Sequence, residues 1–187
     1  MNNNLAEKIE ISSLEFQLLN NYYPRSAVKH LDSKKVDVFD DHCAIHISEA
    51  LYKCGVLMHS FKGVRCWHCP TPDIKGRGIH IIRAQELSDY LNTKPFSNCP
   101  KPLSFEGVNY EEGIKGKTGI VFFKDYWQRN GEKGRTGDHI DLWNKNELVS
   151  LGVIATLVRQ QFPSISERFF SMSDLRQAKQ VLFWEIN

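Results

Sequence analysis

The segment Asp40-Asp41-His42-Cys43-Ala44-Ile45-His46-Ile47-Ser48-Glu49-Ala50-Leu51 predicts a helix that begins at a cysteine. Within it, Ala44, Ile47 and Leu51 recur at i, i+3 and i+7, which gives one apolar stripe. The two aspartates stand upstream, where carboxylates cap a first helical turn. Gly55 follows the segment and can end the helix with a left-handed residue.

Cys43 is therefore expected at or near a helix N-terminus. Exposed N–H groups and the helix dipole favour negative charge at that position. A thiol there is biased toward the thiolate, which is the nucleophilic form. The alternative is that Cys43 only packs, since cysteine is among the most often buried residue types.

Length and composition point to a globular protein. The chain has 187 residues, 41% of them hydrophobic and 25% charged, with a formal net charge of +2. We expect a single catalytic domain over residues 1–187, no nucleic-acid partner and no membrane span. Residues 1–8 lack the basic start and apolar core of a signal peptide, so standard secretion is not expected.

The remaining pattern puts helices before strands. Helices are expected over residues 9–24, where Leu14, Leu18 and Tyr22 would form the buried face, over 84–91 and over 148–162, with a short helical turn near 173–175. Strands are expected at 79–82, 119–124, 139–144 and 181–186, and loops at 25–40, 55–78 and 92–117. This order predicts an α+β fold with an antiparallel sheet.

A second chemical motif lies in residues 138–144. Side chains alternate along a strand, so His139 and Asp141 would point to the same face. A carboxylate there can bond one imidazole nitrogen and leave the other to accept a proton from a thiol. Cys43, His139 and Asp141 together match the order of a papain-like thiol hydrolase. The alternative is that the pair are ordinary polar residues on an exposed strand face.

The other cysteines allow several interpretations. Cys66 and Cys69 form one C-x-x-C motif, and His68 and His80 are conceivable further ligands at a spacing unusual for zinc. We rank structural thiols or a disulfide first, a metal second and redox catalysis last. Any disulfide pairing among Cys54, Cys66, Cys69 and Cys99 is left open.

Residues 41–51 with Gly55, residues 116–121 and residues 137–144 resemble the cysteine and histidine blocks of the type VI secretion amidase effectors, family four. Residues 183–186 also fit. The resemblance implies a papain-like NlpC/P60 fold with the nucleophile at a helix N-terminus. It implies cleavage of the γ-D-glutamyl–meso-diaminopimelate bond in peptidoglycan stem peptides. It makes Cys43 the nucleophile and His139 the base.

The third catalytic residue is less directly implied. Some relatives place an acid several residues after the histidine, and the corresponding segment here, residues 145–150, contains no Asp. Asp141 is the choice from strand geometry, with Glu147 and Asn144 as alternatives. The expected mechanism requires no metal and no other cofactor.

The resemblance also implies a biological setting. The protein would be made in the cytoplasm, carried by a component of the secretion apparatus, and injected into the periplasm of target bacteria. The producer would hold a cognate immunity protein. The alternatives are an intracellular papain-like thiol protease or acyltransferase with another substrate, and a non-catalytic binding module.

Overall fold

The structure is a computed structural model that describes residues 13–73, 75–128, 131, 133–150 and 175–187. The chain divides into two compact units, Met1–Lys101 with Ile186, and Pro102–Glu185 with Asn187. That residues 1–187 act as one catalytic domain stays a prediction.

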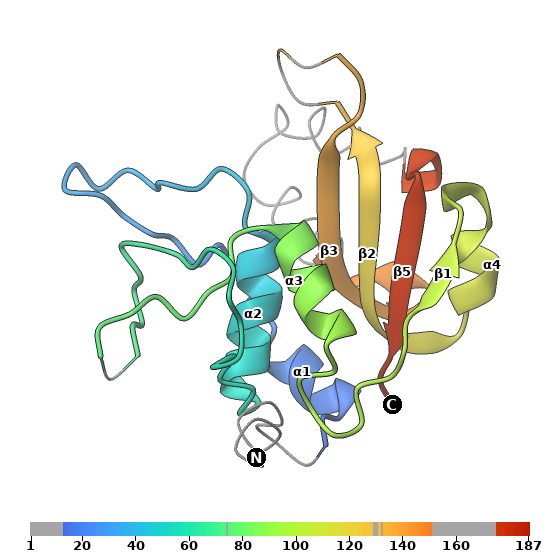
Figure 1. Ribbon diagram of the computed structural model, residues 1–187, viewed down its shortest axis with the longest axis horizontal. Coiled ribbons are helices and arrows are strands. Elements are labelled where there is room, and N and C mark those ends of the chain that lie inside the picture. Colours follow the sequence, from blue (N-terminus) through green and yellow to red (C-terminus); the bar gives the residue numbers. More distant parts are fainter. Residues whose placement is uncertain (1–12, 74, 129–130, 132, 151–174) are drawn as a thin grey trace, which may run out of the picture. The chain divides into compact units, whose positions relative to one another are not determined.

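The first unit is helical. It contains α1 (Phe16–Tyr22), α2 (Cys43–Lys53) and α3 (Ala84–Asn92), and α2 contacts both of the others (Figure 1). The predicted apolar stripe of α2 is confirmed, because Ala44, Ile47 and Leu51 are all buried. Gly55 has a φ of 93°, the left-handed conformation predicted for the end of this helix.

The helix predicted over residues 9–24 is shorter and turned differently. It ends before Pro24 as expected, but residues 9–12 lie outside the described residues. Leu18 and Tyr22 are exposed at 42% each, whereas Phe16 and Leu19 are buried. The i, i+4 spacing of Leu14, Leu18 and Tyr22 thus selected the wrong face, because Leu14 precedes the helix.

Two long loops connect the helices of this unit, as predicted from the polar and Gly/Pro-rich segments. The strand predicted at 79–82 is wrong, because that segment forms only an isolated bridge between Ile81 and Arg65. A similar bridge joins Leu31 to Asp37. These short pairings hold the two loops in place without building a sheet.

Among its described residues, the second unit forms a five-stranded antiparallel sheet in the order β1-β5-β2-β3-β4 (Figure 1). Its elements are β1 (Leu103–Phe105), η1 (Gly107–Asn109), α4 (Tyr110–Ile114), β2 (Lys117–Trp127), β3 (Gly137–Lys145), β4 (Glu147–Leu148) and β5 (Gln180–Glu185). The strands predicted at 119–124, 139–144 and 181–186 are confirmed.

Some predicted segments of this unit need correction. Residues 92–117 were predicted to be a loop, but they contain β1, η1 and α4. In the helix predicted over 148–162, residue 148 belongs to β4 and residues 149 and 150 are helical. Residues 151–162 lie outside the described residues, as do 173 and 174.

The core of this unit lies between α4 and one face of the sheet. The buried side chains that meet there come from α4, from β2 to β5 and from the residues just before β5: Tyr110, Ile114, Val121, Phe123, Tyr126, Trp143, Leu148, Leu175, Ala178, Val181 and Phe183. The side chains of Ile120, Phe122 and Ile140, on the alternate positions of β2 and β3, are also fully buried. The sheet is therefore buried on both faces, so polar groups on it need partners.

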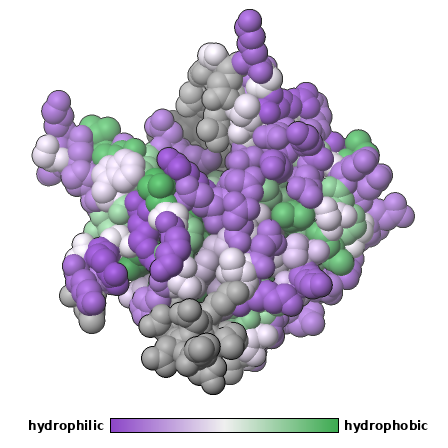
Figure 2. Space-filling view, in the orientation of Figure 1, coloured by the Kyte–Doolittle hydropathy of each residue, from purple (hydrophilic) through white to green (hydrophobic). Residues whose placement is uncertain are grey.

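The face of the molecule in Figure 2 is mainly hydrophilic, with hydrophobic residues in small separate patches. No helix among the described residues is long and apolar enough to cross a membrane. Of the described hydrophobic side chains, Val108, Val36 and Trp67 are the most exposed, each at more than half. Val108 lies in η1 and the other two lie in loops, so the three do not share one element.

Candidate active site

Cys43 is the first residue of α2, as predicted, and it is half-buried. Its N–H donates a hydrogen bond to Oδ1 of Asp41, at 3.0 Å. The carboxylate two residues back thus satisfies one of the N–H groups that a helix start leaves without an intrahelical partner. The position has the chemistry that favours a thiolate, namely N–H groups pointing outward and the positive end of the helix dipole.

Two histidines lie close to Cys43 along the chain: His42 is the N-cap of α2, and His46 is in its first turn. Nε2 of His42 lies 2.9 Å from Oδ2 of Asp37. The ring of His46 meets the ring of Tyr23 edge to face, with centroids 5.6 Å apart. Both side chains are half-buried. That neither of them is the base stays a prediction.

His139 and Asp141 lie on one face of β3, and the structure brings them together. Nε2 of His139 is 3.6 Å from Oδ2 of Asp141. The imidazole ring stacks on Phe123, its neighbour across the β2–β3 pair, with centroids 6.4 Å apart. Tyr126 meets the ring from another side at 6.3 Å. These contacts restrict the orientation of the imidazole.

Asp141 is fully buried, which rules out the alternative of an ordinary exposed strand position. Its Oδ1 accepts the N–H of Leu142 at 2.7 Å. Its Oδ2 accepts the N–H of Ser150 at 3.3 Å and the hydroxyl of the same serine. A buried carboxylate with several donors is held in one position, which suits a residue that orients an imidazole.

Ser150 is a hydrogen-bond partner of Asp141 that the sequence did not indicate. It lies nine positions after Asp141 and just beyond β4, so no strand or helix period relates the two. The other candidates for the third residue are less suited. Glu147 is exposed, and it lies opposite Asn144 in the short β3–β4 pair.

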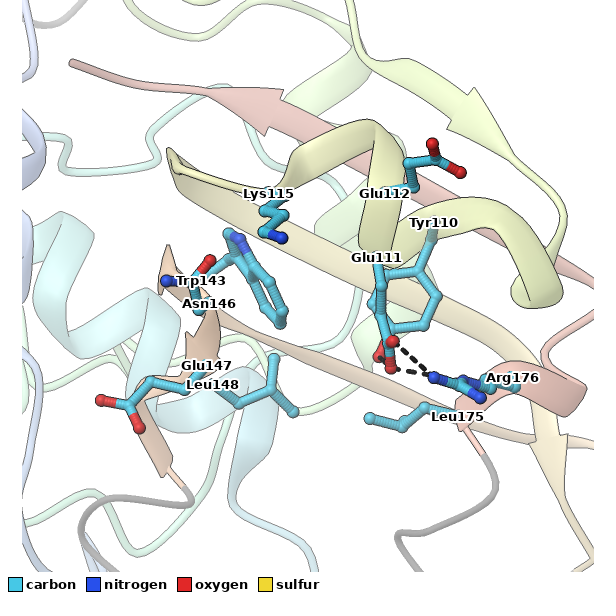
Figure 3. A pocket seen from close by; sticks show the side chains of 10 residues that line it. All are labelled: Tyr110, Glu111, Glu112, Lys115, Trp143, Asn146, Glu147, Leu148, Leu175 and Arg176. Atoms are coloured by element: carbon cyan, nitrogen blue, oxygen red, sulfur yellow. Dashed lines mark hydrogen bonds and ion pairs between the residues drawn. The ribbon is translucent and has the colours of Figure 1, made fainter.

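A pocket of about 760 Å³ lies on the second unit, beside Trp143 and Leu148 (Figure 3). Glu111 in its wall forms an ion pair with Arg176, at 2.7 Å. Glu147 also lines it, but neither His139 nor Asp141 does. The pocket is thus separate from the histidine–aspartate pair.

Two further cysteines are unsuited to nucleophilic chemistry. Burial raises the pKa of the Cys54 thiol to about 11 and that of the Cys99 thiol to about 12. Both are free thiols that stay protonated near neutral pH. Cys43 belongs to the first unit and the His139–Asp141 pair to the second, so their joint action stays a prediction.

Comparisons with known proteins agree on one family. Residues 39–184 match the family described as "Type VI secretion system (T6SS), amidase effector protein 4", abbreviated Tae4. The crystal structure of the type VI effector Tae4 from Enterobacter cloacae is similar, with a TM-score of 0.54 and 18% sequence identity, over 94% of this chain and 99% of that chain. No curated protein matches the chain. The fold is therefore α+β and papain-like, of the NlpC/P60 type, as predicted.

Proposed function

The chain belongs to the Tae4 family of type VI secretion amidase effectors, and on this premise we propose that it hydrolyses the γ-D-glutamyl–meso-diaminopimelate bond of peptidoglycan stem peptides. Membership makes it an antibacterial peptidoglycan amidase, and so a hydrolase. The observation that best supports a thiol mechanism is the buried, hydrogen-bonded Asp141 beside His139 on β3.

We assign the chemistry to three residues. His139 accepts the proton of the Cys43 thiol, and the thiolate attacks the carbonyl carbon of the scissile amide. The C–N bond breaks as His139 returns the proton to the leaving amine. Water then hydrolyses the thioester, with His139 accepting its proton and restoring the Cys43 thiol. Asp141 orients the imidazole and stabilises its protonated form.

The backbone N–H of Cys43, together with a second donor, is the proposed support for the oxyanion. In the structure this N–H donates to Asp41. The proposal therefore requires that the N–H exchange Asp41 for the oxyanion when the tetrahedral intermediate forms. A stronger bond to the developing charge than to the exposed Asp41 carboxylate would favour that exchange.

The decisive experiment is digestion of purified Gram-negative muropeptides, with the products identified by mass. The wild-type protein should release peptides ending in γ-D-glutamate, and Cys43→Ala should release none while keeping a folded circular-dichroism spectrum. Cys54→Ala is the matched control, since it removes a half-buried thiol from the other end of α2. It should retain activity.

Two results would overturn the assignment. Products from a folded Cys43→Ala protein would exclude Cys43 as the nucleophile. Intact muropeptides with a folded wild-type protein would exclude the substrate and favour a thiol protease or acyltransferase. Rapid alkylation of Cys43 near neutral pH would then separate that enzyme from a non-catalytic module.

The delivery route and partners are part of the same proposal. We place synthesis in the cytoplasm of the producer and action in the periplasm of the target cell, after loading onto a component of the secretion apparatus. A cognate immunity protein in the producer would block the enzyme. Its contact surface is proposed in the segment 55–78 and in those parts of 92–117 that lie outside β1, η1 and α4, because binding residues concentrate on loops.

A further inference from the structure

Four side chains with metal-binding atoms converge in the first unit. His30, Cys66, Cys69 and His80 each offer one ligand atom, and these atoms all lie within 4.8 Å of one another. His30 lies in the loop between α1 and α2, and the other three lie in the loop between α2 and α3. Figure 1 shows both loops extending to the left of α2. Two sulfurs and two imidazole nitrogens are a donor set typical of structural zinc.

The distances match a tetrahedral site. Nε2 of His30 lies 2.9 Å from Nδ1 of His80, and the sulfurs of Cys66 and Cys69 each lie 3.6 Å from that same nitrogen. Zinc bonds of ordinary length would set these separations at about 3.3 Å between nitrogens and about 3.5 Å between nitrogen and sulfur. The donors thus surround a space of the size that one zinc ion needs.

The outer hydrogen bonds of the two histidines leave both inner nitrogens without a proton. Nδ1 of His30 lies 2.9 Å from the carbonyl oxygen of Val28, which can only accept, so Nδ1 carries the hydrogen. Nε2 of His80 lies 2.7 Å from Oε2 of Glu49, and it likewise donates. In neutral rings two lone pairs therefore face each other at 2.9 Å, which is repulsive unless a cation lies between them.

The same outer contacts are those of metal-bound histidines. A ligating imidazole commonly donates its second N–H to a carboxylate or a backbone carbonyl, and this cluster has one of each. Glu49 is itself held by Lys53, at 2.9 Å. Two thiolates would neutralise a divalent ion, and the Glu49–Lys53 pair adds no net charge.

The backbone around the cysteines is shaped to bring them close. The N–H of Cys66 donates to the carbonyl of His80 at 2.9 Å. His68, between the two cysteines, has a φ of 52° and turns the chain sharply. A Cβ at Gly78 would lie 2.1 Å from the carbonyl oxygen of Cys66 and 2.7 Å from its sulfur. Only glycine therefore fits beside the Cys66 thiol.

We propose that His30, Cys66, Cys69 and His80 bind one structural Zn²⁺ ion. Four protein ligands close the coordination sphere, and His30 and His80 are fully buried, so the ion would be structural and not catalytic. It joins the two loops, and through Glu49 it connects them to α2. Asp37 extends this connection, since it accepts the N–H of His30 and contacts His42, the neighbour of Cys43.

The site differs from the first-ranked interpretation of the C-x-x-C motif and uses a ligand that the sequence did not indicate. His30 precedes Cys66 by far more than a usual zinc-ligand spacing, so sequence spacing could not identify it. His68 was a conceivable ligand from the sequence. In the part of the chain that the structure describes, it is not a member of the cluster.

The test measures metal in the intact protein and does not depend on enzyme activity. Protein purified with zinc and without chelators should contain about one zinc ion per chain, as measured by inductively coupled plasma mass spectrometry. Cys69→Ser should contain less than about a tenth of that, and Cys99→Ser, which removes a buried thiol outside the cluster, should retain it. Glu49→Gln should weaken zinc affinity about 10–100-fold.

A measurement on the wild-type chain covers the case in which variants fail to fold. A strong chelator should remove the ion and lower Tm, and Zn²⁺ but not Mg²⁺ should restore Tm. Cobalt substituted for zinc should give the visible absorption of a tetrahedral thiolate site. Two results would overturn the proposal. One is folded wild-type protein that holds no metal after zinc incubation, and the other is a Cys66–Cys69 disulfide found by peptide mapping of the folded protein.

Discussion

Asp141 accepts hydrogen bonds from Leu142 and Ser150 while it faces His139, so its substitution should affect both activity and stability. His139→Ala removes the proposed base and should lower kcat/KM on muropeptides about 10²–10⁴-fold. Asp141→Asn should cost less activity, because the base remains. It should also lower the free energy of unfolding by about 1–3 kcal/mol, since an amide NH₂ would face the donors of Ser150.

Asn144→Ala and Glu147→Gln are the matched controls for that comparison. They alter the two other candidates for the third residue and should leave kcat/KM within a few-fold of wild type. A larger loss in Glu147→Gln than in Asp141→Asn would place the orienting carboxylate at position 147.

The thiols of Cys54, which is half-buried, and Cys99, which is buried, should make stability fall at high pH. Burial raises their pKa from an ordinary 9.0 to about 11 and about 12. A raised folded-state pKa contributes stability that is complete below about pH 9 and is lost as the pH rises toward 11–12. Urea unfolding at pH 8 and pH 10 should show this decline.

The comparison variant for the pH experiment is a double substitution, Cys54→Ser and Cys99→Ser. Its unfolding free energy should decline less between the same two pH values than that of the wild type. At pH 8, iodoacetamide should label both native thiols slowly in the folded protein and quickly in urea. Fast labelling of the folded protein would contradict the raised pKa of both thiols.

The positions of residues that depend on the local repeat of a helix or strand could be predicted from the sequence. The alternation of a strand was enough to place His139 beside Asp141, and helix signals were enough to place Cys43 at the start of α2. Ser150 and His30 could not be found this way. Their contacts depend on chain segments that meet only in the folded protein.

Among the elements, long segments with strong patterns were predicted and short ones were not. The strands β2, β3 and β5 carry continuous β-prone runs, and α2 and α3 carry clear helical spacing. By contrast, β1 has three residues and α4 five, which is too short for a period to be recognised. In α1 the periodic residues began before the helix did, which shifted the predicted face.

Gly119 lets β2 lie close to β5. A Cβ at this position would lie 2.0 Å from the carbonyl oxygen of Trp184, which belongs to the neighbouring backbone and cannot swing away. Gly119→Ala should therefore lower the free energy of unfolding by about 1–3 kcal/mol. For a chain of this size that is a Tm loss of about 2–4 °C per kcal/mol.

Lys124→Ala provides the control on the same strand, because its half-buried side chain leaves the backbone pairing intact. It should change the unfolding free energy by no more than about 0.5 kcal/mol. Equal Tm values for Gly119→Ala and wild type would show that the two strands separate easily at this point.

For the whole molecule, toxicity should depend on the compartment. The proposed substrate lies only in the periplasm, so expression with an added signal peptide should lyse a Gram-negative host, and expression without one should not. Cys43→Ala with the same signal peptide should leave growth normal, which separates hydrolysis from a general burden of export. Growth of cells exporting a folded, abundant wild-type protein would contradict the proposed function.

The position of β5 has a consequence for how the protein is made. It follows the four other strands that the structure describes, yet it pairs with both β1 and β2. During translation, the hairpin that carries His139 can form early, but β1 has no neighbour and one edge of β2 stays open until residues 180–185 emerge. Open strand edges invite pairing with other chains. A nascent chain halted before residue 180 would thus be prone to aggregate, and the last strand to be synthesised completes the sheet.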